Sequence, residues 1–270
     1  MQKQQKKYKI AVINTKGGVG KSTISMQLVV PYLYQKFKNP ISFFEFDDEN
    51  EDSISFEKSK LVWLEKVRVA GRDLREELRE ILLLDNHICL DVGANKTAVY
   101  VIDALLDSGM IYTLDAAVIP LMDGELDATS AIQIYQKLKN ANPNLKTIFA
   151  LNRWNENREV ESQFDIFLGD KYGFFDTKGV INYIDERDRN YLVLADSDAI
   201  KYSRAFGITL WEFANQSLDV DKELQEAIAK GASKEEIKRL SFKKALKIDC
   251  KKYNQRILRK AFKKLDEILA

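Results

Sequence analysis

The chain has 270 residues, a mass of 31.1 kDa and a net charge of +1 from 42 basic and 41 acidic side chains. Apolar residues make up 45% of it and charged residues 31%, which excludes a disordered chain and a collagen. Cys89 and Cys250 lie far apart and the chain has 1 histidine, which excludes a disulfide framework and a Cys/His zinc site. No apolar stretch reaches the ~20 residues of a membrane span, and no signal region is present, so we expect a cytoplasmic protein.

Strand-like and helix-like segments alternate along the chain, which is typical of a parallel sheet with helices on both faces. We predict strands over 8–14, 41–46, 87–90, 116–122, 146–151 and, as a sixth, 180–184. We predict helices over 22–37, with a kink or an early end at Pro31, over 61–84, with a break near Gly71, and over 126–140. The fold class is therefore α/β, a doubly wound and mostly parallel sheet.

The composition changes near residue 218. Segments 219–230 and 233–270 are charged and helix-prone, and Gly231 separates them. We expect one large domain over residues 1–217 and a helical extension over residues 218–270 that packs on it.

A glycine-rich stretch, NTKGGVGKST, runs from Asn14 to Thr23 between the first strand and the first helix, the context that a phosphate-binding loop requires. Glycines let consecutive backbone N–H groups converge on an anion, and the helix N-terminus adds its positive dipole end. Lys21 is placed to reach the β- and γ-phosphates of a nucleotide, and Ser22 to hold Mg²⁺. The residues predicted to bind the nucleotide here are Gly17, Gly18, Val19, Gly20, Lys21, Ser22 and Thr23.

Thr15 stands where the generic phosphate-loop pattern has its first glycine, but a second lysine, Lys16, precedes the glycine pair. The segment KGGVGKST resembles the deviant Walker A motif of the ParA/MinD family of P-loop ATPases. This resemblance implies ATP and Mg²⁺ as cofactors. It also implies an ATP-bound homodimer in which Lys16 reaches the partner's ATP, so that Lys16 and Lys21 are both catalytic.

Two predicted strands end in a carboxylate. Strand 41–46 leads into Asp47 and Asp48, and strand 87–90 leads into Asp91. Mg²⁺ and an attacking water need oxygen ligands at such strand ends. By resemblance, Asp91 holds Mg²⁺ through water and Asp47 positions the attacking water, with Asp48 as a rival for that role. Because Asp48 and Glu49 replace the family's usual residues after Asp47, the geometry of this loop stays open.

Asn152 and Arg153 follow the fifth predicted strand. In relatives an Asn at this position reads the adenine edge, and an amide suits the donor and acceptor groups of adenine. Arg153 is placed to stack on the base. The segment from Ala195 to Trp211 resembles the loop and helix that lie near the base in this family.

The last thirty residues hold ten basic and three acidic side chains, so the first 240 carry a net charge of −6. Apolar residues recur at helical spacing from Ile257 to Leu269 and form one face of a helix. Three interpretations stay open: the basic face binds DNA phosphates, the helix lies on an anionic membrane, or the helix is a solvated packing helix. We favour DNA, and the predicted DNA-binding residues are Lys243, Lys244, Lys247, Lys251, Lys252, Arg256, Arg259 and Lys260.

The resemblance implies a ParA-like, Mg²⁺-dependent partition ATPase that binds DNA without sequence preference as an ATP dimer. A centromere-binding, ParB-like partner would stimulate hydrolysis, and the protein would be nucleoid-associated. One alternative is a MinD-like or conjugative-plasmid regulator that acts at a membrane or a protein machine. The other is a metabolic P-loop enzyme, which gives no reason for the lysine-rich end.

Overall fold

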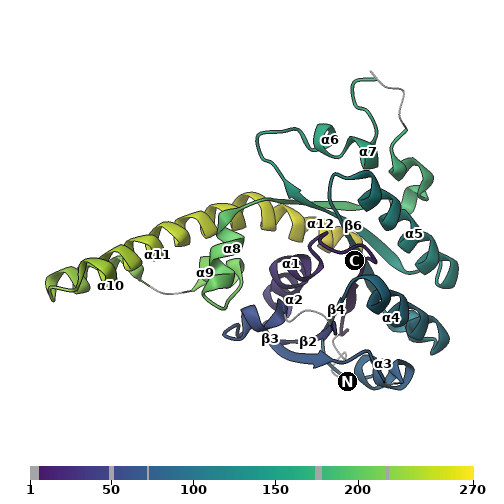
Figure 1. Cartoon of the computed structure of the whole chain (residues 1–270), viewed down its shortest axis with the longest axis horizontal. Coiled ribbons are helices and arrows are strands. Elements are labelled where there is room, and N and C mark those ends of the chain that lie inside the picture. Colours follow the sequence, from purple (N-terminus) through teal and green to yellow (C-terminus); the bar gives the residue numbers. More distant parts are fainter. Residues whose placement is uncertain (1–5, 49–51, 72, 174–177, 217–218) are drawn as a thin grey trace.

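The computed structural model describes residues 6–48, 52–71, 73–173, 178–216 and 219–270. Its centre is a seven-stranded, all-parallel sheet in the order β3-β2-β4-β1-β5-β6-β7 (Figure 1). The predicted α/β, doubly wound fold is confirmed. The strands are β1 (Lys9–Val12), β2 (Ile41–Phe46), β3 (Val62–Val67), β4 (Ile88–Val92), β5 (Ala116–Leu121), β6 (Lys146–Trp154) and β7 (Tyr191–Ala195).

Helices cover both faces of the sheet, because successive side chains of a strand point to opposite sides. In β1, Ile10 and Val12 join one buried apolar cluster, whereas Ala11 joins the other. Helices α1 (Lys21–Ile24), α2 (Val30–Phe37), α8 (Asp198–Ala205), α9 (Leu210–Asn215), α11 (Lys234–Tyr253) and α12 (Arg259–Leu269) contribute to the first cluster. The second is covered by α3 (Leu74–Leu82), α4 (Asn95–Asp107), α5 (Glu125–Ala141), α6 (Val160–Gln163) and α7 (Asp165–Leu168).

Short helical turns complete the chain. The 3₁₀ turns are η2 (Asp52–Phe56), η3 (Met110–Thr113), η4 (Val180–Tyr183) and η5 (Glu186–Asp188). Two π turns, η1 (Ser25–Val29) and η6 (Asn254–Leu258), join α1 to α2 and α11 to α12. The N–H of Val30 donates to the carbonyl of Ser25, the i to i+5 bond of a π turn. Pro31 follows directly, and its ring is accommodated by the wider turn rather than by an early end of the helix.

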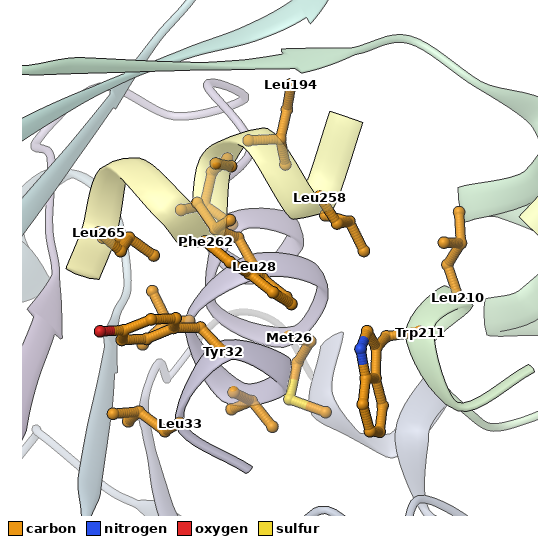
Figure 2. Packing of buried hydrophobic residues seen from close by; sticks show 14 of the residues in the cluster. Met26, Leu28, Tyr32, Leu33, Leu194, Leu210, Trp211, Leu258, Phe262 and Leu265 are labelled. Atoms are coloured by element: carbon orange, nitrogen blue, oxygen red, sulfur yellow. The ribbon is translucent and has the colours of Figure 1, made fainter. Parts of the chain in front are cut away.

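The predicted C-terminal helices are present as α10 (Val220–Ala229) and as the run from α11 to α12. Phe262 and Leu265 of α12 pack against Leu28 and Tyr32 of the helix that follows the phosphate loop (Figure 2). Helix α10 and the first turns of α11 instead extend away from the sheet as a helical hairpin (Figure 1). The predicted domain boundary at 217/218 lies outside the described residues.

Two sequence predictions are wrong. Residues 61–84 are not one broken helix, because Val62–Val67 pairs with β2 as an edge strand and only Leu74–Leu82 is helical. The predicted break is present, since Gly71 takes φ 77 between the two elements. Residues 180–184 are not a strand, because 180–183 form a 3₁₀ turn. The last strand is Tyr191–Ala195, which pairs with β6.

Candidate nucleotide-binding site

A cavity of about 300 Å³ lies where the phosphate loop meets the carboxyl ends of β2 and β4. The strand order reverses around β1, and the carboxyl end of such a sheet is where open α/β folds bind their ligands. Six of the seven predicted loop residues line the cavity, and the seventh, Val19, is buried. The lining residues are Gly17, Gly18, Gly20, Lys21, Ser22, Thr23, Glu45, Asp47, Asp91, Val92, Gly93, Ala94, Asn95, Arg153 and Arg204.

The start of the loop is fixed by Asn14, which is fully buried. Its Nδ2 donates to the carbonyl of Pro120 at 2.7 Å, and its Oδ1 accepts from the Lys16 N–H at 3.0 Å and from the Ser130 hydroxyl at 2.5 Å. The Asn95 N–H donates to the Thr15 carbonyl at 2.8 Å. The loop is therefore tied to the ends of β4 and β5, which preorganises it before any ligand binds.

Glycine is required at position 20 for two reasons. Gly20 has φ 89, which side chains disfavour, and a Cβ there would lie 2.0 Å from Nδ2 of Asn152. That same Nδ2 donates to the Val19 carbonyl at 3.0 Å. Asn152, predicted to read adenine, therefore also holds the phosphate loop.

The two lysines of the motif lie in different surroundings. Lys21 is buried, lines the cavity, and donates from Nζ to the carbonyl of Lys16 at 3.1 Å. The side chain of Lys16 is exposed, and Lys16 is not one of the described residues that line the cavity.

Asp91 lies in β4 and is 3% exposed. Burial raises the pKa of its carboxyl group to about 7. The hydroxyls of Ser22 and Ser25, which donate to this carboxyl group, and the nearby charge of Lys21 lower the pKa, but by less than burial raises it. Glu45 raises that pKa further, because β2 and β4 place the two residues opposite each other. Ser25 belongs to no recognised motif, although its spacing of three and four residues from Ser22 and Lys21 on a helix is a signal for it.

The side chains of Asp47 and Asp48, at the end of β2, have different surroundings. Asp47 lines the cavity, whereas both carboxylate oxygens of Asp48 accept backbone N–H groups, from Val69 at 2.9 Å and Ala70 at 2.8 Å. A Cβ on Gly93 would lie 2.7 Å from the Phe46 carbonyl, so the loop after β4 packs closely on the end of β2. Asp47 therefore faces the ligand site and Asp48 stabilises the loop after β3.

A second cavity of about 560 Å³ adjoins the first, and Thr23, Arg153 and Arg204 line both. Arg153 has φ 57 beside a register shift between β6 and β7, and such irregularities redirect a side chain. The second cavity is also lined by Gln27, Phe56 and Asn152 and, from the predicted base-proximal segment, by Ala195, Asp196, Ser197, Asp198, Ile200 and Lys201. Arg204 and Lys201 lie in that segment, but no motif gave them a role.

The C-terminal helix contacts the wall of this second cavity. The hydroxyl of Tyr253 donates to the Ala195 carbonyl at 2.9 Å, and burial raises the pKa of Tyr253 well above its ordinary value. Arg256 pairs with Glu156, in the loop that follows β6. The end of α11 is therefore anchored beside the cavity rather than packed on the sheet alone.

Several of the predicted DNA-binding cations have protein partners. Lys243 pairs with Glu223 at 2.8 Å, Lys244 pairs with Asp221, and Lys247 donates to the Gln216 carbonyl at 3.0 Å. Lys251, Arg259 and Lys260 are exposed, as is Lys252, which lies 3.8 Å from Asp249. No helix within the described residues has the length and apolar character to cross a bilayer.

The residues of the first cavity fit a magnesium nucleotide. Within the described parts of the chain, no group of three or more His, Cys, Asp or Glu side chains is arranged to hold a metal by itself. Mg²⁺ usually binds through one or two carboxylates together with substrate phosphates, which the Ser22 hydroxyl and the Asp91 carboxylate beside a glycine loop allow. The surroundings of Gly18 are open, because a Cβ there would meet nothing within 4 Å, and this leaves room for a phosphate group beside the loop.

Neither a protein-family model nor a curated protein matches the sequence. Solved structures do match. A chain of the MinC:MinD cell division complex of Aquifex aeolicus matches with a TM-score of 0.50 and 12% identity, over 77% of this chain and 88% of that one. MinD of Pyrococcus horikoshii with Mg-ADP matches with a TM-score of 0.47 and 16% identity, over 75% and 87%.

A plasmid partition protein of Borrelia burgdorferi bound to AMPPNP matches with a TM-score of 0.46 and 14% identity, over 72% of this chain and 90% of that one. At 12% identity, the match to the Aquifex chain concerns the fold. The resemblance found in the phosphate-loop motif is confirmed at that level: this chain has the P-loop fold of the MinD/ParA type.

Proposed function

We propose that the chain is a Mg²⁺-dependent ATPase of the ParA type, which pairs on ATP and binds DNA without sequence preference. The observation that carries the proposal is the placement of the two motif lysines, with Lys21 buried in the cavity and Lys16 exposed outside it. One lysine serves the subunit's own nucleotide, and the other serves that of a partner.

The chemistry is the in-line attack of water on the γ-phosphate of ATP. Lys21 neutralises charge that develops on the phosphate oxygens, and Asp47 orients the attacking water from the end of β2. Ser22 and, through water, Asp91 hold Mg²⁺, which supplies electrostatic stabilisation of the phosphate oxygens when bound. Asn152 and Arg153 contact the base in the adjoining cavity.

Exposed apolar residues near the carboxyl ends of the strands support pairing. Leu126, in the first turn of α5 after β5, is 71% exposed, and Tyr100, in α4 after β4, is 56% exposed. They lie on elements that follow the strand ends at the cavity. A second subunit placed across this edge would cover them and bring its Lys16 to the bound nucleotide.

DNA is the surface that the basic C-terminal helix fits best. Lys251, Arg259 and Lys260 are exposed, and three phosphate contacts predict a slope of log K against log salt near −2.7, from about 0.9 for each contact. In this proposal a centromere-binding partner stimulates hydrolysis and releases the protein from a nucleoid.

Cosedimentation tests the choice of surface. The protein is pelleted with plasmid DNA or with anionic liposomes, each with ATP or ADP. Pelleting with DNA in ATP alone supports the proposal, and no pelleting with DNA in either nucleotide overturns it.

A regulator that acts at a membrane or a protein machine is the second candidate. It is favoured by exposed apolar side chains on the C-terminal helices, since Ile228 in α10 and Phe242 and Ile248 in α11 are 56%, 43% and 45% exposed. ATP-dependent pelleting with liposomes and not with DNA would select this candidate.

A further inference from the structure

A serine outside the phosphate-loop motif contacts the carboxylate assigned to the metal. Ser25 is fully buried, and its Oγ donates to Oδ1 of Asp91 at 2.9 Å. Ser25 is not one of the described residues that line the cavity. It therefore acts on a ligand only through Asp91.

The helix places Ser25 at this point. Lys21 and Ser25 are four residues apart and share one side of the helix, facing the end of β4. Ser25 begins the π turn that ends before Pro31. The first turn presents polar side chains to the cavity edge, whereas Leu28 and Tyr32 beyond it face the core (Figure 2).

The other neighbours of Asp91 explain why its carboxylate needs the hydrogen bond from Ser25. Glu45 stands opposite it across β2 and β4, and both side chains are buried. Ser22 also donates to Asp91, but the Ser22 hydroxyl has a second task as a metal ligand. Ser25 also lies within hydrogen-bonding reach of the buried Cys89 thiol but does not line the cavity, so its bond to Asp91 can keep one carboxylate oxygen fixed when the metal binds.

We propose that Ser25 is a positioning residue, whose hydroxyl fixes the Asp91 carboxylate in the orientation that holds Mg²⁺. The inference rests on the proposed function, since it assumes a magnesium nucleotide in the cavity. Groups that hydrogen-bond a direct metal ligand typically change metal affinity about 10- to 100-fold when they are removed, and because Asp91 reaches the metal through water, the lower end of that range, about 10-fold, applies here. The expected effect of losing the Ser25 hydroxyl is a weakening of Mg²⁺ binding of that size.

The test is a Mg²⁺ titration of the binding of a fluorescent ATP analogue to the full chain. In Ser25→Ala the Mg²⁺ concentration at half-saturation should rise about 10-fold, while affinity in EDTA stays at the wild-type value. Ser25→Thr, which keeps a hydroxyl, should restore the wild-type midpoint. Ser42→Ala removes another buried hydroxyl, at the opposite end of the sheet, and should leave the midpoint unchanged.

Two outcomes overturn the inference alone: a wild-type Mg²⁺ midpoint in Ser25→Ala, or an equal loss of affinity with and without Mg²⁺, which would mean a merely structural role. If Ser25→Ala does not fold, Ser25→Cys fills the site with a slightly larger side chain and a weaker donor, and an unshifted midpoint in that variant has the same meaning. A wild-type protein whose nucleotide binding ignores Mg²⁺ would instead overturn the proposed function.

Discussion

Asp47 and Asp48 are adjacent in the sequence and differ in what their side chains contact. Asp47 lines the cavity, whereas Asp48 holds the N–H groups of Val69 and Ala70. We expect Asp47→Ala to bind ATP but to lose hydrolysis about 10²-fold or more, because the attacking water loses its acceptor. Phosphate release under ATP saturation measures this.

Asp48→Ala is the matched comparison. It should hydrolyse ATP near the wild-type rate and lose about 1–2 kcal/mol of unfolding free energy, because two backbone donors lose a charged acceptor. If Asp48→Ala abolished hydrolysis and Asp47→Ala did not, the two roles would have to be exchanged.

His87 is a buried residue whose titration affects stability. Tyr8 N–H donates to its Nδ1 at 3.1 Å, its ring stacks on Phe37 at 3.9 Å, and burial lowers its pKa from 6.5 to about 4. Between these values the unfolded chain binds a proton that the folded chain does not. The free energy of unfolding should therefore fall by about 2 kcal/mol as the pH is lowered from 6.5 toward 4.

Denaturant unfolding at several pH values checks the role of His87. His87→Asn keeps an acceptor for the Tyr8 N–H and removes the titrating group. Its unfolding free energy should depend less on pH over that window than that of the wild type. Identical pH dependence in both proteins would assign the effect to other groups.

At the scale of elements, the phosphate loop depends on close contact between backbone and side chain. Gly20 and Gly71 both have a positive φ, 89 and 77, but a Cβ at Gly20 meets Asn152 and one at Gly71 meets nothing within 4 Å. Both substitutions by alanine should cost about 1–2 kcal/mol for the left-handed backbone. Gly20→Ala should cost about 2 kcal/mol more and lose nucleotide binding, because the loop must shift.

Thermal unfolding and nucleotide titration of the Gly20→Ala and Gly71→Ala proteins separate these two costs. Equal stability and equal binding in the two variants would show that the contact with Asn152 does not shape the loop.

The sequence predicts the elements that lie inside the sheet and not those at its two edges. Central strands such as β2 and β4 are buried along their whole length, so they appear as continuous apolar runs. The edge strand β3 exposes most of its residues, with Trp63 at 58%, and its charged sequence continues into α3, so the two resemble one helix. The opposite edge strand, β7, follows a charged turn and has five residues.

The residues of the candidate site, too, are predictable from the sequence only where a local pattern marks them. The phosphate loop and both carboxylate positions are recognisable because a motif fixes their spacing. The separate roles of Asp47 and Asp48 depend on the loop after β3, which is the segment whose secondary structure the sequence did not predict. Arg204 reaches the site through tertiary packing, for which no local pattern exists, whereas Ser25 lies one helical turn after Lys21, a spacing that predicts a shared side of the helix.

At the scale of the whole molecule, the proposal requires two copies of the chain. Lys16→Ala should bind ATP but lose ATP-dependent dimers, because the exposed ammonium group is the one assigned to the partner's phosphates. Light scattering with ATP and with ADP measures this. Lys7→Ala, another lysine ahead of the loop, is the control and should dimerise normally; intact dimers in Lys16→Ala would exclude action across subunits.

The hydrogen bond from Tyr253 to the Ala195 carbonyl has a thermodynamic consequence. Ala195 lines the second cavity, and Tyr253 belongs to the helix that carries the exposed cations. If ATP in this cavity reorients that helix, ATP binding and DNA binding are coupled by one free energy. By thermodynamic linkage, this coupling acts equally in both directions. Under the proposed function, duplex DNA would then tighten ATP binding by the same factor by which ATP tightens DNA binding, and DNA would act as an effector of the nucleotide site.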